Sequence, residues 1–405
     1  MRIASVSLLV AGACVLALQS PVLAWHSGPH MIVAAIARSE ISALAQLKVD
    51  YILGLWRGQY PAEEGTQSPD HANIEHSSVW LDDINGKGPP YEKPSRRFDF
   101  LQIFRFMHGV NIPYNPEGIK LQGLDAFLPL YERSADFLLD MAWDGLKATT
   151  PTTEKLEDPF CSYPPPVSPF TLASYSEGTV NAANGKFLES SHPEEYRRNT
   201  GVSARSSQVS TDAESPVSTV LSLNFFLRML IHLVADIHQP LHSLLAFSPA
   251  FPHGDRFGTK ISMVLPNGKN TNLHAFWDGA GGVYLKRSKD FTDEEIAEEA
   301  RLIKLEFPKE SLENHLKPEL LAPNFRNMAE ESHRLGATLA YREFNFHTFK
   351  QHDLPYAPTV HYLTDVRHAC RRQIALAGYR LGYALEEVSA SLPVPEFLQN
   401  HVHAA

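Results

Sequence analysis

Cysteine is scarce in this chain, with 3 cysteines among 405 residues. Cys14 falls in the N-terminal segment that we interpret below as a signal peptide, so at most one disulfide can form in the mature chain. This excludes a fold held together by several bridges. Cys161 and Cys370 form either one bridge or two unpaired buried thiols, and the sequence leaves both readings open.

Other features that would define a class of protein are also missing. No Asn-x-Ser/Thr triplet occurs, so N-glycosylation is not expected. Beyond the N-terminus, no apolar run is long enough for a transmembrane helix. Positive charge is in deficit, with 36 Lys and Arg against 46 Asp and Glu and a net charge of −10. That balance argues against a broad basic groove around duplex nucleic acid, but it permits a small site where metal ions meet phosphate.

The N-terminus carries the pattern of a secretory signal peptide. Arg2 gives a positive start, residues 6–18 are apolar, and Val22-Leu23-Ala24 forms a small-residue cleavage site. We therefore predict a signal peptide over residues 1–24, a mature chain that begins at Trp25, and a secreted or lumenal protein without a membrane span.

Helical periodicity dominates the mature chain, whose hydrophobic content of 43% is ample for a core. The predicted class is mainly α, with a single domain over residues 25–398 and a tail over 399–405. A Pro- and Ser-rich stretch without periodicity, about 149–216, is predicted to be a surface insertion in that domain. Helices are expected over residues 31–41, 71–84, 124–146, 221 to the residues before Pro240, 292–307, 324–344 and 363–392, with a hairpin within 247–270.

One stretch, residues 231–242, carries the clearest chemistry. His232 and Asp236 are four residues apart, so they share one face of the predicted helix. Proline ends a helix, because the residue before it leaves the α region. His242 should therefore stand just beyond the helix end and point back toward the same space. Such polar side chains in an apolar segment are costly unless they bind something.

A second copy of this spacing follows, with His274 and Asp278 again four residues apart. Imidazole with carboxylate is a typical zinc ligand set, and several sets in one chain indicate a multinuclear site. Other histidines are less informative. His71 and His76 are interpreted as surface residues, and a lone His108 is more often a core histidine. The free amine and the carbonyl of Trp25 could together chelate a metal near His30, although a frayed terminus is the simpler interpretation.

Taken together, these motifs resemble the zinc-dependent single-strand-specific nuclease and 3′-nucleotidase family, also called type I nucleases. The resemblance rests on motifs that span most of the mature chain in the family's order: Trp25 with His30, Trp80-x-Asp82, His108 before Pro113-Tyr114-Asn115-Pro116, His232-x3-Asp236-x-His238-Gln239-Pro240-Leu241-His242, Asn272-Leu273-His274-x2-Trp277-Asp278, and the C-terminal Ala377-Gly378-Tyr379-Arg380-Leu381.

The resemblance implies a helical fold around three zinc ions and a defined ligand set for each. The first would be held by Asp82, His108, His232 and Asp236. The second would be held by the Trp25 amine and carbonyl, His30 and a bridging Asp236, and the third by His242, His274 and Asp278. Zinc would lower the pKa of a bound water, so that hydroxide forms near neutral pH and attacks phosphorus. Asp82 would orient that water or help to deprotonate it. The implied substrates are single-stranded DNA or RNA and 3′-nucleotides.

This chain departs from the family pattern near the expected base pocket and at one charge. Asn85 replaces the usual basic residue, and Gly109 replaces the aromatic residue that follows the histidine of the extended motif. Asn111 replaces an acid, and Asp255-Arg256-Phe257-Gly258-Thr259 replaces Asp-Arg-Gly-Gly-Asn. Base preference is therefore not carried over from the family.

Two alternatives compete with a nuclease. A zinc phospholipase C has a related three-zinc helical fold, but the short spacing from Trp25 to His30 and an aspartate at Asp278 favour the nuclease. A secreted zinc-binding protein with a degenerate site would fit Asn85. Nine intact ligand positions count against it, because charged groups are costly to keep buried without a function.

Overall fold

The computed structural model describes residues 25–55, 72–83, 107–121, 134–148, 216–286, 290–350 and 355–393. The predicted signal peptide and C-terminal tail lie outside these residues, as do His71, Asn85, Cys161 and most of the predicted insertion. The elements are α1 Ser27–Glu40, α2 Ala43–Gly54, α3 Ile74–Ser77, α4 Trp80–Asp83, β1 Pro113–Tyr114, α6 Ala135–Lys147, α8 Pro216–Asp236, η3 Pro240–Ser243, β2 Leu245–Ala246, β3 Ser262–Val264, β4 Asn270–Asn272, α9 Leu273–Asp278, α10 Asp293–Glu306, η5 Lys309–His315, η6 Pro318–Leu320, α11 Phe325–Leu335, η7 Gly336–Ala340 and α12 Val360–Ser389.

The chain is mainly α, as the periodicity predicted. Backbone contacts divide it into two units, one made of residues 1–155 with 220–405 and the other of residues 156–219. Apart from the first turn of α8, the second unit lies outside the described residues. The predicted insertion and domain limits therefore stay predictions, and the elements below belong to the first unit.

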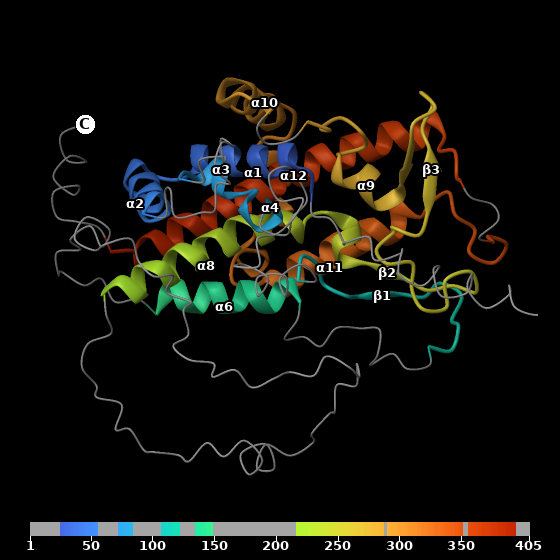
Figure 1. The fold of residues 1–405 in the computed structure, drawn as a ribbon, viewed down its shortest axis with the longest axis horizontal. Coiled ribbons are helices and arrows are strands. Elements are labelled where there is room, and N and C mark those ends of the chain that lie inside the picture. The colour runs from blue at the N-terminus through green and yellow to red at the C-terminus, as the bar shows by residue number, and fades with distance from the viewer. Residues whose placement is uncertain are drawn as a thin grey trace, which may run out of the picture. The chain divides into compact units, whose positions relative to one another are not determined.

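The long helix α12 packs against α1, which also contacts α10 (Figure 1). Gly378 lies at the contact, where an added Cβ would come 2.5 Å from Ile36 Cβ. The close approach of the two helices therefore requires a residue without a side chain. This packing fixes the first turn of α1, which carries His30, relative to the rest of the core.

A second layer is built on α8, whose described part is apolar and deeply buried. Figure 1 shows α6 running beside it, and Phe226 of α8 contacts α6 at Gly145. The buried Asn224 of α8 donates to the backbone carbonyls of Ile52 and Leu53 at the end of α2. These contacts hold the C-terminal half of α8, with His232 and Asp236, in the centre of the core.

Strands are short in the described part of the chain. β1 pairs with β2 in parallel, which places the segment after His108 beside the segment after His242. β3 and β4 form an antiparallel hairpin in which Ser262 pairs with Asn272. A turn at Pro266-Asn267-Gly268 closes it, and Gly268 adopts a φ of 78°. The hairpin leads directly into α9, which carries His274 and Asp278.

The helix predicted over residues 71–84 is wrong in one respect, because the structure has two short helices there, α3 and α4. They are separated at Ser78 and Val79. The carbonyl oxygen of Ser78 accepts a hydrogen bond from Nδ1 of His232 at 2.6 Å. In a continuous helix, the carbonyl of Ser78 would accept a hydrogen bond from the backbone four residues on; here it accepts one from the side chain of His232 instead. The break between α3 and α4 also orients Asp82 toward the site.

The helix over residues 221 to Pro240 is also shorter than expected, because α8 ends at Asp236. His238 donates its Nδ1–H to the carbonyl of Val234 at 2.7 Å, which satisfies an acceptor at the helix end. The backbone N–H of Gln239 then bonds to Asp236 at 2.9 Å, so the chain tightens before the proline. Gln239 is extended, as the residue before a proline should be.

The remaining helices follow the sequence more closely. The helix predicted over residues 292–307 is confirmed as α10, which begins with a capping box of Thr292 and Glu295. The helix predicted over residues 324–344 is α11, which continues into the π-helical η7 at Gly336. An added Cβ on Gly336 would meet the carbonyl of Pro240 at 3.1 Å, so η7 begins where α11 meets η3. No described helix, α12 included, has the length and apolar character needed to span a bilayer.

Candidate metal centre

Eight of the nine predicted ligand residues contribute a histidine or aspartate side chain, and the structure brings all eight together. They come from separate segments, namely α1, α4, the loop before β1, α8, η3 and α9. Seven of them are fully or almost fully buried, whereas the Asp82 side chain is 16% exposed. The eight are His30, Asp82, His108, His232, Asp236, His242, His274 and Asp278.

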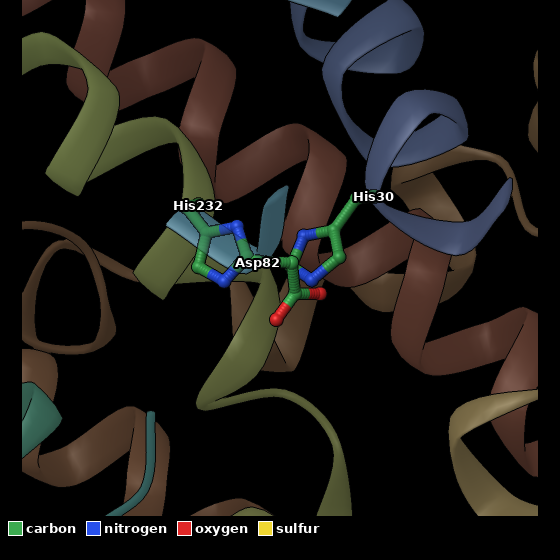
Figure 2. A group of neighbouring side chains, drawn as sticks. All are labelled: His30, Asp82 and His232. Carbon is green, nitrogen blue, oxygen red and sulfur yellow. The ribbon is translucent and has the colours of Figure 1, made fainter. Parts of the chain in front are cut away.

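These side chains form three groups, within each of which the candidate ligand atoms lie no more than 4.8 Å apart. Group A is His30, Asp82 and His232; group B is His108, His232 and Asp236; group C is His242, His274 and Asp278. Figure 2 shows group A, where the rings of His30 and His232 flank the carboxylate of Asp82. The two rings stack with their centroids 4.1 Å apart. Group C has the same residues as the third predicted ligand set. Groups A and B differ from the first two sets, because Asp82 lies with His30 and His232 in group A.

Asp236 lies at the junction of the groups. Its Oδ2 is 2.9 Å from His108 Nδ1 and 3.1 Å from His232 Nε2. Its Oδ1 is 3.4 Å from both His30 Nε2 and His242 Nδ1. The two oxygens therefore face different histidines, which is the arrangement that a bridging carboxylate needs.

Burial sets the protonation of this cluster. It lowers the pKa of His30, and it lowers the pKa of His108 to about 4, so both imidazoles are neutral near pH 7. Burial alone would raise the pKa of Asp236, but the charges of His232 and His242 hold that pKa well below its usual range. Neutral imidazole beside carboxylate anion is the form in which these groups bind a divalent cation.

Backbone carbonyls fix the orientation of three of the imidazoles. Nδ1 of His232 bonds to Ser78 at 2.6 Å, Nδ1 of His242 to His108 at 3.0 Å, and Nδ1 of His274 to Phe257 at 2.8 Å. A carbonyl oxygen can only accept, so each Nδ1 must carry the proton. Despite their burial, Asp236 raises the pKa of His232 and His242, so a cation would have to displace the proton from Nε2 of these two rings. Each Nε2 faces its group, as in metal-binding histidines.

Several atoms at the centre make no hydrogen bond, although they are buried among the described residues. They are Nδ1 and Nε2 of His30, Oδ1 of Asp236 and Oδ2 of Asp278. Buried polar atoms are nearly always satisfied, and an unpaired buried charge is strongly unfavourable. A cation would satisfy these atoms, so the donor set fits a metal centre of nitrogen and oxygen ligands.

Trp25, the ninth predicted ligand residue, is not frayed. Its side chain is 1% exposed, and its indole N–H donates to the carbonyl of Ala235 at 2.9 Å. The next backbone N–H, of His26, donates to the carbonyl of Asp278 at 2.9 Å. The backbone of Trp25 is thereby held beside the residues that end α8 and α9.

Gln239 is a contributor that the sequence reasoning missed. Its side chain is fully buried and donates to Oδ1 of Asp278 at 2.8 Å, while its own oxygen accepts from the N–H of Leu241 at 2.6 Å. The amide occupies one oxygen of Asp278 and leaves Oδ2, which makes no hydrogen bond, facing His274, whose Nε2 is 3.4 Å away. The feature of the sequence that could have identified Gln239 is its position inside the His-Gln-Pro-Leu-His motif.

We expect Gln239→Ala to weaken metal binding at group C by about 10–100-fold, the usual effect of losing a hydrogen bond to a ligand. Chelator-competition titration of the metal-loaded protein measures this directly. Gln46→Ala is the matched control, because Gln46 is a partly buried amide that bonds to the carbonyls of Arg38 and Ile41 on the α1–α2 connection. Equal metal retention by the two variants would contradict the role given to Gln239.

His238 has a different role from the other histidines of its motif. Its Nε2 accepts from the buried Arg380 of α12 at 3.0 Å, and its carbonyl accepts from Gln373 at 2.9 Å. Burial and the charge of Arg380 lower the pKa of His238 to about 3, so it stays neutral. Arg380 also pairs with Glu331 of α11. This network anchors the turn between Asp236 and His242 to α11 and α12.

Two further sequence interpretations concern residues near the site. His76 belongs to none of the three groups; its side chain is 23% exposed and pairs with Asp293 at 2.9 Å. Gly109 has a steric reason to lack a side chain, because an added Cβ would lie 2.6 Å from the carbonyl oxygen of His242. The backbones of residues 109 and 242 are in contact, which draws His108 and His242 together.

The comparisons with known proteins bear on these groups. A model of the S1/P1 nuclease family matches residues 180–390, just over half of the chain. The chain belongs to the S1/P1 nuclease family. The match includes five of the candidate ligand residues, from His232 to Asp278, while the others precede it. A comparison with curated proteins gives no match.

Family membership makes this chain a phosphoester hydrolase of the nuclease type. S1/P1 nucleases depend on metal ions, and the three His and Asp groups of this member are able to bind them. Buried oxygen and nitrogen atoms that make no hydrogen bond lie in these same groups.

Proposed function

We propose that this protein is a secreted zinc-dependent phosphodiesterase that hydrolyses single-stranded DNA and RNA to 5′-nucleotides and removes the 3′-phosphate from nucleotides. The observation that carries the proposal is the convergence of eight histidine and aspartate side chains from distant segments, with buried polar atoms that make no hydrogen bond. The signal pattern of residues 1–24 supports secretion.

Three zinc ions would be held by the ligand sets that the family resemblance implies. Asp82, His108, His232 and Asp236 would hold one ion, and the Trp25 amine and carbonyl, His30 and Asp236 another; His242, His274 and Asp278 would hold the third. When bound, zinc lowers the pKa of water and stabilises negative charge on phosphate oxygens. Zinc is favoured over magnesium because the donors are rich in imidazole nitrogen.

Asp82 is the residue to which we assign a catalytic role. Its carboxylate is the part of the cluster that reaches the surface, and its Oδ1 lies 3.9 Å from His108 Nδ1. A partly exposed carboxylate can accept a proton from an attacking water and align it with phosphorus. The other carboxylates, Asp236 and Asp278, are fully buried and are suited to holding ions.

The single-strand preference follows from the burial of the centre. All the candidate ligands except Asp82 are almost inaccessible, so a phosphate must approach closely to reach them. A single strand can present one phosphate and swing its bases aside, whereas a duplex must first unpair.

Elemental analysis with substrate assays tests the proposal. The purified mature protein, never exposed to chelator, should contain about three zinc ions per chain. It should cleave single-stranded DNA and RNA faster than duplex DNA, and it should release phosphate from 3′-nucleotides but not from 5′-nucleotides. A content of one zinc or none, or faster hydrolysis of phosphatidylcholine than of any nucleotide, would refute it.

A further inference from the structure

A cavity of about 750 Å³ lies between α1, α10 and α12, apart from the metal centre. Its walls come mainly from the C-terminal half of α1, from α10, from the start of η5 and from Tyr379 of α12. Beside the cavity, α10 packs against both α1 and α12 (Figure 1). None of the eight candidate ligand residues is among the described residues that line it. Sites for small molecules have volumes of about 300–1,000 Å³, so an organic molecule would fit.

Two lysines converge on one carboxylate at one end of this cavity. Nζ of Lys304 lies 2.5 Å from Oε1 of Glu40, and Nζ of Lys309 pairs with Oε2 of the same residue. Burial raises the pKa of Glu40, but its bonds to the two lysines outweigh burial and lower that pKa, so Glu40 is an anion at neutral pH. One negative charge against two positive charges leaves one positive charge in excess.

The other charged side chains of the wall do not cancel this excess. Arg38 is held by the carboxylates of Asp50 and Glu75, and Arg301 pairs with a glutamate of its own helix. Glu310 also lines the cavity, but it is exposed, so solvent and salt screen its charge. The excess positive charge therefore stays at the two lysines.

Both lysine ammonium groups are held in defined positions. Lys304 also donates to Oγ of Ser39 at 2.8 Å. Nζ of Lys309 lies 5.6 Å from the centroid of the Tyr379 ring, within the range of a cation–π contact. Tyr379 is itself fixed, since its hydroxyl donates to the carbonyl of Phe307 at 3.0 Å. An entering anion would meet two preorganised donors, which lowers the entropic cost of binding.

Much of the remaining wall is apolar. It includes the side chains of Ala35, Ala297, Ala300, Leu305 and Pro308. Leu305, in the last turn of α10, is 67% exposed. A ligand that covered this leucine would remove apolar surface from water, which favours binding. The cavity therefore combines a cationic end with an apolar wall.

We propose that this cavity is a binding site for a small organic anion. The acidic group of the ligand, a carboxylate, sulfonate or phosphate ester, lies between Lys304 and Lys309. Its aryl or alkyl body lies against Leu305 and the alanines. A metal cation is a poorer occupant, because Glu40 and Glu75 are already paired with lysine and arginine. The site is separate from the proposed nuclease centre, and neither inference depends on the other.

The test uses two fluorescent probes with the same aromatic body and the secreted protein as purified. One probe, 8-anilinonaphthalene-1-sulfonate, is an anion; the other, N-phenyl-1-naphthylamine, lacks the sulfonate and is neutral. Fluorescence titration gives the Kd of each probe, and the ratio of the two Kd values reports the selectivity for an anion. Looser packing would change the binding of both probes, so the ratio separates a lost charge from a disturbed fold.

Lys309→Met removes one ammonium group and keeps the apolar stem of the side chain. Its matched control is Lys286→Met, because Lys286 and Lys309 are both 52% exposed and each pairs with a glutamate. Lys286 also lies over a ring, that of Phe291 at 5.3 Å, but it does not line the cavity. Leu305→Ser tests the apolar wall, and Leu302→Ser is its control, since Leu302 is an exposed residue of the same helix outside the cavity.

The wild type should bind one molecule of the anionic probe per chain. Lys309→Met should weaken anion binding about fivefold and leave the neutral probe unaffected, because one ion pair is lost. Glu40→Gln should strengthen anion binding about fivefold, because no carboxylate then competes for the lysines. Leu305→Ser should weaken the binding of both probes about threefold. Both controls should match the wild type, and Lys309→Met should cleave single-stranded DNA at the wild-type rate.

Three results would overturn the proposal. The first is a wild type without saturable binding of the anionic probe. The second is an equal effect of Lys309→Met and Lys286→Met on the ratio of the two Kd values. The third is weaker anion binding by Glu40→Gln, or an equal gain for both probes in that variant.

Discussion

Asp236→Asn should lose about two of the three zinc ions that we propose, and almost all activity. One oxygen of Asp236 faces His108 and His232, and the other faces His30. A carboxamide has the same shape but offers one neutral acceptor, so it cannot neutralise two neighbouring cations. Group C has its own carboxylate in Asp278 and should keep its ion. Elemental analysis and an assay on single-stranded DNA measure the two effects.

Two other variants serve as comparisons for Asp236→Asn. Asp278→Asn should lose about one ion, because that carboxylate belongs to group C alone. His76→Ala should keep full zinc content and activity, since His76 pairs with Asp293 outside the three groups. If Asp236→Asn retained as much zinc as His76→Ala, the assignment of Asp236 as a bridging ligand would be wrong.

A chain with even one residue left before Trp25 should be about a hundredfold less active and should contain about one zinc ion fewer, because losing a metal ligand costs about 3 kcal/mol of transition-state stabilisation. The backbone of Trp25 is held by bonds of the indole and of the His26 N–H to Ala235 and Asp278. A peptide bond at Trp25 replaces the basic amine with a group that does not bind zinc.

The matched variant for this experiment is Trp25→Phe with a free N-terminus. It removes the indole bond to Ala235 but keeps the amine, so it should retain its zinc and lose less activity than the extended chain. Full activity and zinc content in the extended chain would exclude the amine as a ligand. N-terminal sequencing of the secreted protein should begin at Trp25.

Local signals in the sequence were sufficient for most of the helices. Periodic apolar residues mark α1 and α12, and the Thr292 capping box marks the start of α10, because these features act within a few residues. The helix over residues 71–84 failed because its break depends on His232, which is far away in the sequence. The end of α8 shifted for a similar reason, since the His238 side chain satisfies the helix end before Pro240.

The candidate metal centre was predictable only in part from the residues themselves. His232 with Asp236 and His274 with Asp278 stand out because each pair shares a helical face in an apolar segment. His30 and His108 carry no such spacing, and only the family resemblance selected them. The carbonyls of Ser78 and Phe257 leave no trace in a sequence, because every residue has one. The left-handed backbone of Arg256 and Phe257 could not be predicted from the sequence either, since neither residue is glycine.

The contact between α1 and α12 also bears on how the chain can be made. Residues 27–40 leave the ribosome early, but the helix that covers them spans residues 360–389. At the usual rate of translation, α1 waits on the order of tens of seconds for this partner. Ile36, which is buried against α12 in the fold, lacks this partner throughout that time, which favours aggregation. Biosynthesis of this protein should therefore depend on a chaperone that shelters α1 until the last helix emerges.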